Sequence, residues 1–478
     1  MSVAKTVWML AMAAALASMS ACNGKPSQAA EERTVEVVKA QEAAADVVSV
    51  AYSEASKVAV YDRALASVTQ AAVAALEPNE SVLASVARAA YARGDTETGL
   101  KAYAAALARG PLSADHTLMH GESLLAAKRP EEARAVLIEG EAHYLSDLRF
   151  APLIERSLDE DPRFIPEVRT LKSDVDLDAI KYLGGGSTIV LRLLKDKQTI
   201  GAFKPKQNRQ QSDFRSEIAA WRICPMIRCG FEIPYNQHVR LTWRDFDGLY
   251  SRLTSEKQVA YRENLEDLVF IKEDGVDWVH GTLKDWVPEF TQLPIEIGAF
   301  WRPWLALESE LTALEAPATD ILKIIRKLHP SGERLERELT QHMGTMTKRD
   351  LARQLSNMLA YDFLINNWDR FSGVKEFWGV NCQFANGHIV SIDNGAAFPK
   401  TTNEKVDKHL QDVQRFSRQL VKAVRELDHD RTLARLFPEA TDYERERYET
   451  FWTQRTLFLA YVDGLIAAHG ESAVLAFD

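Results

Sequence analysis

The stretch Leu364–Gly373, LINNWDRFSG, places an Asp-Arg pair, a tryptophan and two asparagines in one short polar segment. Asp369 is the only carboxylate in this stretch. A second aspartate, Asp393, follows 24 residues later in VSIDNGAAF. Two carboxylates on neighbouring loops can share one site, so the segments around them decide whether these two do.

The segments on either side predict a helix, a loop and a hairpin. Residues 347–365, TKRDLARQLSNMLAYDFLI, carry apolar residues at helical spacing, which predicts an amphipathic helix. The members of that apolar stripe are Ala352, Leu355, Leu359 and Phe363. Residues 376–384 and 388–392 predict two strands joined at Asn386-Gly387, a pair typical of tight hairpin turns. Because Asp393 ends the second strand, we expect it to lie near Asp369.

A second group of charged residues lies upstream, where the sequence changes from helical to β-rich. A glycine run at 184–186 precedes a predicted strand, KDKQ turns the chain, and TIGAFKPK returns as a strand carrying Lys204. SDFRSEIAAWRIC then predicts a helix that begins at Ser212 or Asp213 and carries Glu217. Taken singly, these are equally well a plain turn, a solvated lysine and a surface glutamate. Their order favours a nucleotide site, in which glycine backbone and lysine meet phosphates.

Together these segments resemble the secretory-pathway kinases, the family of the Golgi casein kinase, the proteoglycan xylose kinase and the four-jointed kinase. The likeness covers residues 182–398 and rests on AFKPK, SEIAAWR, HGTLKDWVPEF, NWDR and IDNGAAF in that order. It implies ATP and Mg²⁺ or Mn²⁺ as cofactors, with Asp369 as catalytic base and Asp393 as metal ligand. The nucleotide-binding residues that it implies are Gly184, Gly185, Gly186, Ser187, Lys204, Glu217, Leu283 and Trp286.

The sequence departs from that family after the Asp-Arg pair and in its cysteines. Val374 stands five positions after Asp369, where family members commonly carry a histidine-rich segment or an asparagine. Asn381 could supply the second metal contact, although it falls inside the predicted first strand of the hairpin. The cysteine framework of the animal enzymes is absent. These departures bear on the metal geometry and the substrate class more than on the fold.

The region before residue 172 is Ala-rich and helix-periodic. Two segments align at a period of 34 residues, with Gly94 and Lys128 in the same predicted turn. Paired helices at this period resemble tetratricopeptide repeats, which bind partner proteins. A plain helical bundle that packs on the next domain is the alternative.

The N-terminal residues predict export and lipidation. A lysine at position 5, an apolar run at 7–19 and small residues before Cys22 are signal-peptide features, and the run is too short to span a bilayer. The stretch MSAC resembles the bacterial lipobox, which implies a lipid on Cys22 and a place in the bacterial cell envelope. By the same resemblance, Asn23 favours the outer membrane. The alternative is an ordinary secretory signal.

Length and composition are consistent with this plan. A chain of 478 residues is long enough for two or three domains. Asp and Glu number 68 against 58 Lys and Arg, which argues against a nucleic-acid-binding surface. Cys224 and Cys229 are close enough for a disulfide in an oxidising compartment, and two buried free thiols are an equal alternative.

We therefore expect an α+β protein in which an all-α helical-repeat domain precedes a bilobal, atypical protein-kinase-like domain. The expected ranges are a signal peptide at 1–21, a tether at 22–44, the helical repeats at 45–171 and the kinase-like domain at 172–478, with lobes at 178–280 and 287–478. The expected activity is phosphoryl transfer from ATP to a hydroxyl on a protein or glycan. The alternatives are a pseudokinase scaffold and a nucleotidyl (AMP) transferase.

Overall fold

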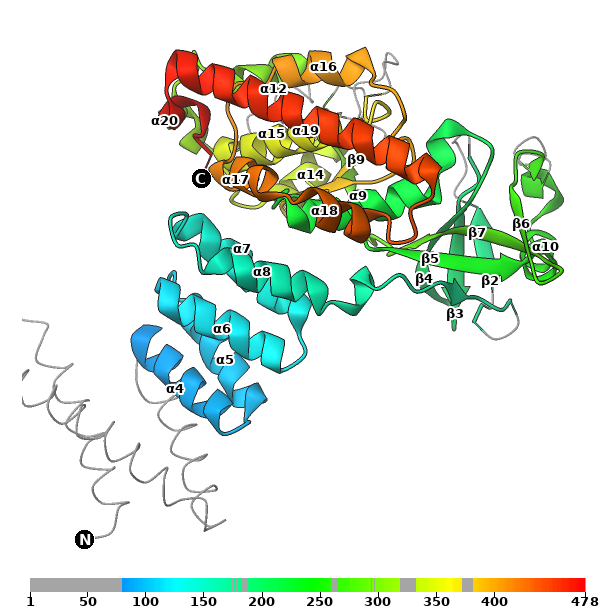
Figure 1. The fold of residues 1–478 in the computed structure, drawn as a ribbon, viewed down its shortest axis with the longest axis horizontal. Helices are drawn as coiled ribbons and strands as arrows, with labels where there is room; N and C mark the ends of the chain where they lie inside the picture. Colours follow the sequence, from blue (N-terminus) through cyan, green and yellow to red (C-terminus); the bar gives the residue numbers. More distant parts are fainter. Residues whose placement is uncertain are drawn as a thin grey trace, which may run out of the picture. The chain divides into compact units, whose positions relative to one another are not determined.

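The computed structural model describes most of the chain beyond residue 79. The described residues are 80–173, 176–177, 179–182, 188–258, 265–293, 295, 297–318, 332–371 and 381–477. The predicted signal peptide, Cys22, the tether and the glycine loop with Ser187 lie outside them. The chain divides into two compact units, Met1–Gly140 and Glu141–Asp478 (Figure 1). Within the described residues, no helix is both long and apolar enough to cross a membrane.

Paired helices make up the described part of the first unit. They are α4 (Glu80–Ala92), α5 (Thr96–Leu107), α6 (Ala114–Ala126) and α7 (Pro130–His143), the last of which continues into the second unit. Gly94 and Lys128, which the sequence placed in equivalent turns, both have positive φ, at 76° and 59°. The next N–H in each turn donates five residues back, from Asp95 to Ala90 and from Arg129 to Leu124. The two turns are therefore the same helix-ending motif, 34 residues apart.

The second unit has mixed helix and strand content. Its larger sheet has the order β1-β5-β7-β4-β3-β2, with β6 also paired to β7 and with β1 parallel to β5. The strands of this sheet are β1 (Arg169–Thr170), β2 (Ala179–Tyr182), β3 (Leu191–Lys195), β4 (Gln198–Pro205), β5 (Asn236–Thr242), β6 (Phe270–Glu273) and β7 (Val276–Lys284). A smaller sheet contains β8 (Thr291–Gln292), β9 (Cys382–Ala385) and β10 (His388–Ser391). The part of the chain that the structure describes is 53% helical and 15% strand with a mixed sheet, which is compatible with an α+β fold.

Two predicted hairpins are confirmed. Asp196 and Lys197 turn β3 into β4 with φ of 49° and 64°, and Asn386 and Gly387 turn β9 into β10 with φ of 49° and 82°. Two successive positive φ values match the right-handed twist of the flanking strands. Two details differ from the prediction. β9 begins at Cys382, so Asn381 lies just before the strand and not within it, and β10 ends at Ser391, so Asp393 lies two residues past the strand.

The other elements of the second unit are mostly helices. They are α8 (Phe150–Asp159), η2 (Pro162–Phe164), η3 (Gln210–Ser212), α9 (Phe214–Met226), α10 (Trp243–Tyr250), α12 (Gly298–Leu305), η4 (Leu311–Glu315), α14 (Gly332–Met343), α15 (Lys348–Leu364), α16 (Glu404–Gln411), α17 (Arg418–Glu426), α18 (His429–Leu436), α19 (Asp442–His469) and α20 (Glu471–Val474).

The helix that carries Glu217 and the helix that precedes Asp369 form where the sequence predicts. Asp213 is the N-cap of α9 and accepts from the N–H of Arg215. Thr347 caps α15 in a capping box with Asp350, which satisfies donors that a helix start leaves unpaired. The predicted apolar stripe of α15 is buried, but so are its other faces, because the helix is surrounded by neighbours in the core. The sequence predicted an amphipathic helix and the structure shows a central one.

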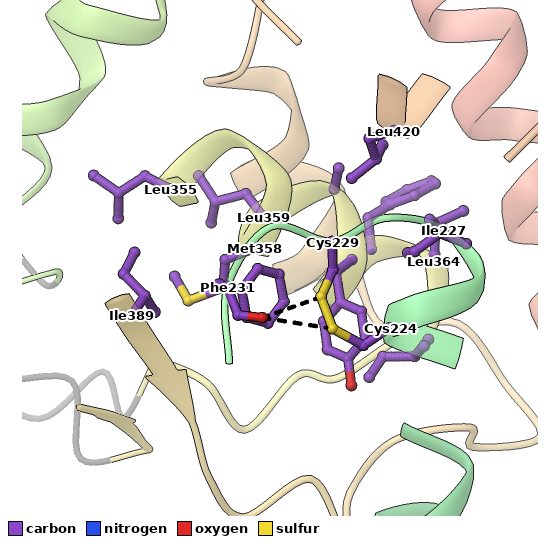
Figure 2. Packing of buried hydrophobic residues seen from close by; sticks show 14 of the residues in the cluster. Cys224, Ile227, Cys229, Phe231, Leu355, Met358, Leu359, Leu364, Ile389 and Leu420 are labelled. Atoms are coloured by element: carbon purple, nitrogen blue, oxygen red, sulfur yellow. Dashed lines mark hydrogen bonds between the residues drawn. A yellow bond between two sulfur atoms is a disulfide. The ribbon is translucent and has the colours of Figure 1, made fainter. Parts of the chain in front are cut away.

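A disulfide joins Cys224 in α9 to Cys229 just beyond the helix end. Figure 2 shows it packed among apolar side chains of the helical core, including Met358 and Leu364 of α15. The bond settles the alternative that the sequence left open. Cys382 is a buried free cysteine, and burial raises its pKa to about 12.

Candidate functional site

Lys204 is held by the alternation of β4. Phe203 points into the apolar core of the larger sheet, so Lys204 points to the opposite face. The residue is only 1% exposed. Nζ donates to the Gln211 carbonyl at 2.8 Å, to Glu217 Oε1 at 3.3 Å and to Asp393 Oδ1. Burial disfavours the ammonium, but Asp393 and Glu217 outweigh it and raise the pKa of Lys204.

Glu217 joins three segments from the first turn of α9. Its carboxylate is fully buried and accepts from two lysines, Lys204 and Lys284, the latter at 2.8 Å. Its other oxygen accepts the backbone N–H of Asn394 at 2.9 Å. A buried carboxylate that has lost its water is stable only with such partners. Lys284, at the end of β7, is a site residue that the sequence analysis missed.

Asp393 lies two residues past the end of β10 with φ of 58°, which turns the backbone sharply at this point. Its carboxylate keeps 36% of its surface exposed and pairs with the nearly buried Lys204. Burial opposes ionisation of Asp393, but Lys204 and Lys284 outweigh it and lower its pKa to about 2. Asp393 is therefore ionised at neutral pH. Its carboxylate is partly exposed to solvent, and Lys204 and Lys284 stabilise its charge.

Gly395 allows these groups to approach one another. A Cβ at this position would overlap the Gln211 carbonyl oxygen and would stand 3.1 Å from Lys204 Nζ. Only a glycine fits between the lysine and the segment that precedes α9. The sequence contained this signal in Asp-Asn-Gly, although the contact partner could not be read from it.

Asp369 lies in the loop after α15 and is half-buried. Burial, and then the charge of Asp393, raise the pKa of Asp369, against the opposing effect of Lys204, Arg370 and Lys405. Asn381 donates from Nδ2 to the Asp369 carbonyl at 2.8 Å and to its carboxylate at 3.4 Å. The structure thus brings Asp369 close enough to Asp393 and Lys204 for their charges to act on it.

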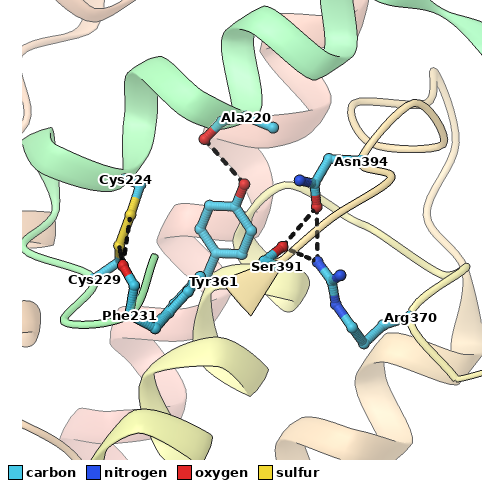
Figure 3. Close-up of a disulfide and its surroundings, with 8 residues drawn as sticks. All are labelled: Ala220, Cys224, Cys229, Phe231, Tyr361, Arg370, Ser391 and Asn394. Atoms are coloured by element: carbon cyan, nitrogen blue, oxygen red, sulfur yellow. Dashed lines mark hydrogen bonds between the residues drawn. A yellow bond between two sulfur atoms is a disulfide. The ribbon is translucent and has the colours of Figure 1, made fainter. Parts of the chain in front are cut away.

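Arg370 fixes the arrangement of the two loops. It is 1% exposed and binds Asp362 of α15 through two hydrogen bonds, both of 3.0 Å. Nη2 also donates to Ser391 Oγ at 2.6 Å and to Asn394 Oδ1 at 2.7 Å, as Figure 3 shows. Nη1 donates to the carbonyls of Asn381 and of Ile392, the latter at 3.1 Å.

Asn367 completes this cluster, since its amide donates to Asn394 at 3.1 Å and to Asp362 at 3.4 Å. We call these five residues, Asp362, Asn367, Arg370, Ser391 and Asn394, the Arg370 network. The two asparagines before Asp369 stood out in the sequence, but their role, and that of Asn394, could not be read from it. The Arg370 network explains why Asp369 and Asp393 lie close together: the residues that follow them, Arg370 and Asn394, are hydrogen-bonded to each other.

The remaining predicted nucleotide-binding residues are placed differently. Leu283 lies in the apolar core of the larger sheet, because β7 alternates and its neighbour Lys284 takes the face toward Glu217. Trp286 is half-buried. The guanidinium carbon of Arg192 lies over the Trp286 ring, 4.3 Å from the ring centre. Gly184, Gly185, Gly186 and Ser187 lie outside the described residues.

The donor set fits a hard divalent cation. Asp369 and Asp393 offer carboxylate oxygens and Asn381 an amide oxygen, the ligand types that Mg²⁺ and Mn²⁺ take. Burial, and then repulsion from Asp393, raise the pKa of Asp369, and a cation between the two carboxylates would relieve the repulsion. In the described part of the chain, no group of three or more His, Cys, Asp and Glu side chains is arranged to hold a metal ion by itself. Oxygens from a bound phosphate would have to complete such a site.

Comparison with known proteins found no matching protein family and no curated protein of significant similarity. We therefore infer a function from the arrangement of the residues above.

Proposed function

We propose that the second unit is an atypical kinase that transfers the γ-phosphoryl group of ATP to a hydroxyl on a protein or glycan. The observation that carries the proposal is the buried lysine shared by two carboxylates. Lys204 contacts both Glu217 and Asp393, and Asp369 lies within the reach of their charges. A lysine, a helix glutamate, a loop aspartate and an aspartate after a hairpin are the parts that phosphoryl transfer needs.

Each residue has a role that its surroundings support. Lys204, held by Glu217, would bind the α- and β-phosphates, and Asp393 would hold Mg²⁺ or Mn²⁺, which neutralises phosphate charge. Asp369 would accept the proton of the attacking hydroxyl as the new O–P bond forms and the bond to the ADP oxygen breaks. Its raised pKa suits a base, because a carboxylate that holds a proton more tightly accepts one more readily.

We also propose that the second unit is bilobal and has the fold of an atypical protein kinase. In support, the second unit has two separate apolar cores, one inside the larger sheet and one among the helices around α15. The first unit would be a tetratricopeptide-like scaffold that recruits a partner protein. The equivalent turns at Gly94 and Lys128 support this reading.

The proposed location is the bacterial cell envelope, with a lipid on Cys22 that holds the protein on the outer membrane. The disulfide between Cys224 and Cys229 supports an oxidising compartment, since such bonds rarely persist in a reducing cytosol.

A second candidate, a pseudokinase that binds partners without catalysis, is favoured by one observation. Asp393 already pairs with Lys204, so both charges are satisfied before any nucleotide or metal binds. Binding MgATP must break this ion pair, and a site that stays closed would not turn over.

Intact-mass spectrometry tests the proposal. The soluble form that starts at Asn23 is incubated with ATP and Mg²⁺ or Mn²⁺, alone and with casein-like or sugar acceptors, beside its Asp369→Asn and Asp393→Ala variants. We expect a phosphoryl adduct with wild type only. An adenylyl adduct would identify a nucleotidyl transferase, and nucleotide binding without any adduct would identify the pseudokinase.

A further inference from the structure

A cavity of about 80 Å³ lies beside α9, away from Lys204 and both aspartates. It is open to solvent on one side and is lined by residues before β1, by α9, by the start of β5 and by residues 436–439 at the end of α18. Part of its wall is apolar or aromatic, with Phe214 and Ile218 from α9, Tyr235 and Phe437 in that part. Three arginines also line it: Arg163, Arg215 and Arg222.

Two of these arginines are neutralised by carboxylates. Arg163 binds Asp161 through Nε at 3.0 Å and through Nη2 at 2.8 Å. Arg215 pairs with Glu444, the N3 residue of the α19 capping box. Their charges are thus balanced within the protein.

Arg222 is different. It is 5% exposed, and Nη1 donates to the Arg435 carbonyl at 3.0 Å. Its Nε is buried without a hydrogen-bond partner, and no carboxylate among the described residues forms an ion pair with it. Burial lowers the pKa of Arg222 to about 10, so the side chain is still a cation at neutral pH. Buried cations without a counter-charge are rare, because desolvation is costly unless a partner offsets it.

His238, which also lines the cavity, is affected by the positive charges of the nearby arginines. Burial, and then the charges of His280, Arg215, Arg240 and Arg222, lower the pKa of His238 to about 3. The imidazole is therefore neutral at physiological pH. Glu167 and Glu439 also line the cavity, but both are exposed to solvent and leave the interior positive.

We propose that this cavity binds a small organic carboxylate that carries an apolar group. The carboxylate would pair with the Arg222 guanidinium, whose planar fork matches two oxygens, and the apolar group would lie against Phe214, Ile218 and Phe437. This site is separate from the proposed kinase site and does not depend on it. Both sites use α9, however, since Phe214, Ile218 and Arg222 lie on one side of the helix and Glu217 contacts Lys204 from another.

The experiment measures binding of phenylacetate to the soluble form that starts at Asn23, by calorimetry and by the shift of the thermal unfolding midpoint. Phenylacetamide, which has the same shape without the charge, is the ligand control. Arg222→Met keeps the side-chain length and removes the cation. The matched protein control is Arg455→Met, because Arg455 also bonds backbone carbonyls while lying outside the cavity.

We expect phenylacetate to bind and phenylacetamide not to. Arg222→Met should weaken binding by at least about tenfold, and Arg455→Met should leave the affinity unchanged. Without ligand, Arg222→Met should unfold at the same temperature as wild type or higher, since the buried cation lacks a counter-charge. A purely structural arginine would instead lower the midpoint.

Two outcomes would overturn the proposal: no binding of phenylacetate to wild type, or equal binding to Arg222→Met. If Arg222→Met does not fold, Ile218→Phe provides the test, because it fills the cavity from α9 and keeps Arg222. Undiminished phenylacetate binding to Ile218→Phe would equally exclude this cavity as the site.

Discussion

Arg370 Nη2 donates to Asn394 Oδ1 at 2.7 Å, and this bond joins the loop of the first candidate aspartate to the loop of the second. Arg370 directly follows Asp369 and Asn394 directly follows Asp393. The separation of the Asp369 and Asp393 carboxylates is therefore set by the residues that follow them, Arg370 and Asn394, which are both buried. The Arg370 network therefore positions the backbone of both loops through contacts within the protein.

Loss of Arg370 should destabilise the second unit strongly. Arg370→Met leaves Asp362 buried without its cation, which costs about 3–5 kcal/mol. Urea unfolding measures the effect. The double variant Arg370→Met with Asp362→Asn removes both charges and should recover much of the loss. A single variant as stable as wild type would show that the Arg370 network does not hold the two loops.

Gly395→Ala should displace the groups around Lys204 and lower the stability of the protein. The added methyl group overlaps the Gln211 carbonyl oxygen, so the backbone must move at a cost of about 1–3 kcal/mol. Gly464→Ala in α19 is the control, because nothing lies near its Cβ and alanine favours a helix by up to about 1 kcal/mol. Thermal unfolding of both variants measures the difference. Equal midpoints would mean that the close approach at Gly395 is easily relaxed.

Lys284→Met should weaken MgATP binding by about tenfold, through Glu217. Without Lys284, Glu217 keeps only Lys204 as a cationic partner and draws it away from a phosphate. Lys181→Met, in the same sheet but exposed, is the matched control and should bind as wild type does. Calorimetric titration with MgATP measures both. Unchanged affinity of Lys284→Met would separate this lysine from the site.

Asp393→Asn should lower stability, and the difference from wild type should vanish in acid. The pKa of Asp393 is lowered from 3.8 to about 2, so its ionised form stabilises the native state above pH 3.8. That stabilisation is lost as the pH falls through about 2. Urea unfolding between pH 7 and pH 2 tests this. A difference that grows toward acid would show that Asp393 is not held ionised by its lysines.

Asp369→Asn should have the opposite effect at neutral pH and raise stability. A raised pKa means that the native state disfavours the ionised carboxylate, so its stability falls as the pH rises above 3.8. Asparagine removes the charge and its repulsion from Asp393. Thermal unfolding at pH 7, with no nucleotide, should show a higher midpoint, which is typical of residues kept for function. A lower midpoint would make Asp369 a structural residue.

Much of the local structure could be predicted from the sequence. The helix at 348–364, its start at Thr347, the hairpin at Asn386-Gly387 and the start of α9 at Asp213 are as expected, to within a residue. Such features depend on periodicity and capping within a few neighbouring residues, so the sequence alone contains their causes. The order of Lys204, Glu217, Asp369 and Asp393 was likewise visible.

The pairing of these residues was decided by tertiary structure. Lys204 and Asp393 are 189 residues apart, and any of the chain's 68 carboxylates could have met this lysine. Leu283 lies in the apolar core and Lys284 contacts Glu217, because the register of β7 against β4 sets which side of the sheet each residue faces. The sequence by itself determined which elements form and which chemical groups they carry. Packing alone decided which charges are buried together, as at Arg370, and which is left without a counter-charge, as at Arg222, because desolvation depends on neighbours from distant parts of the chain.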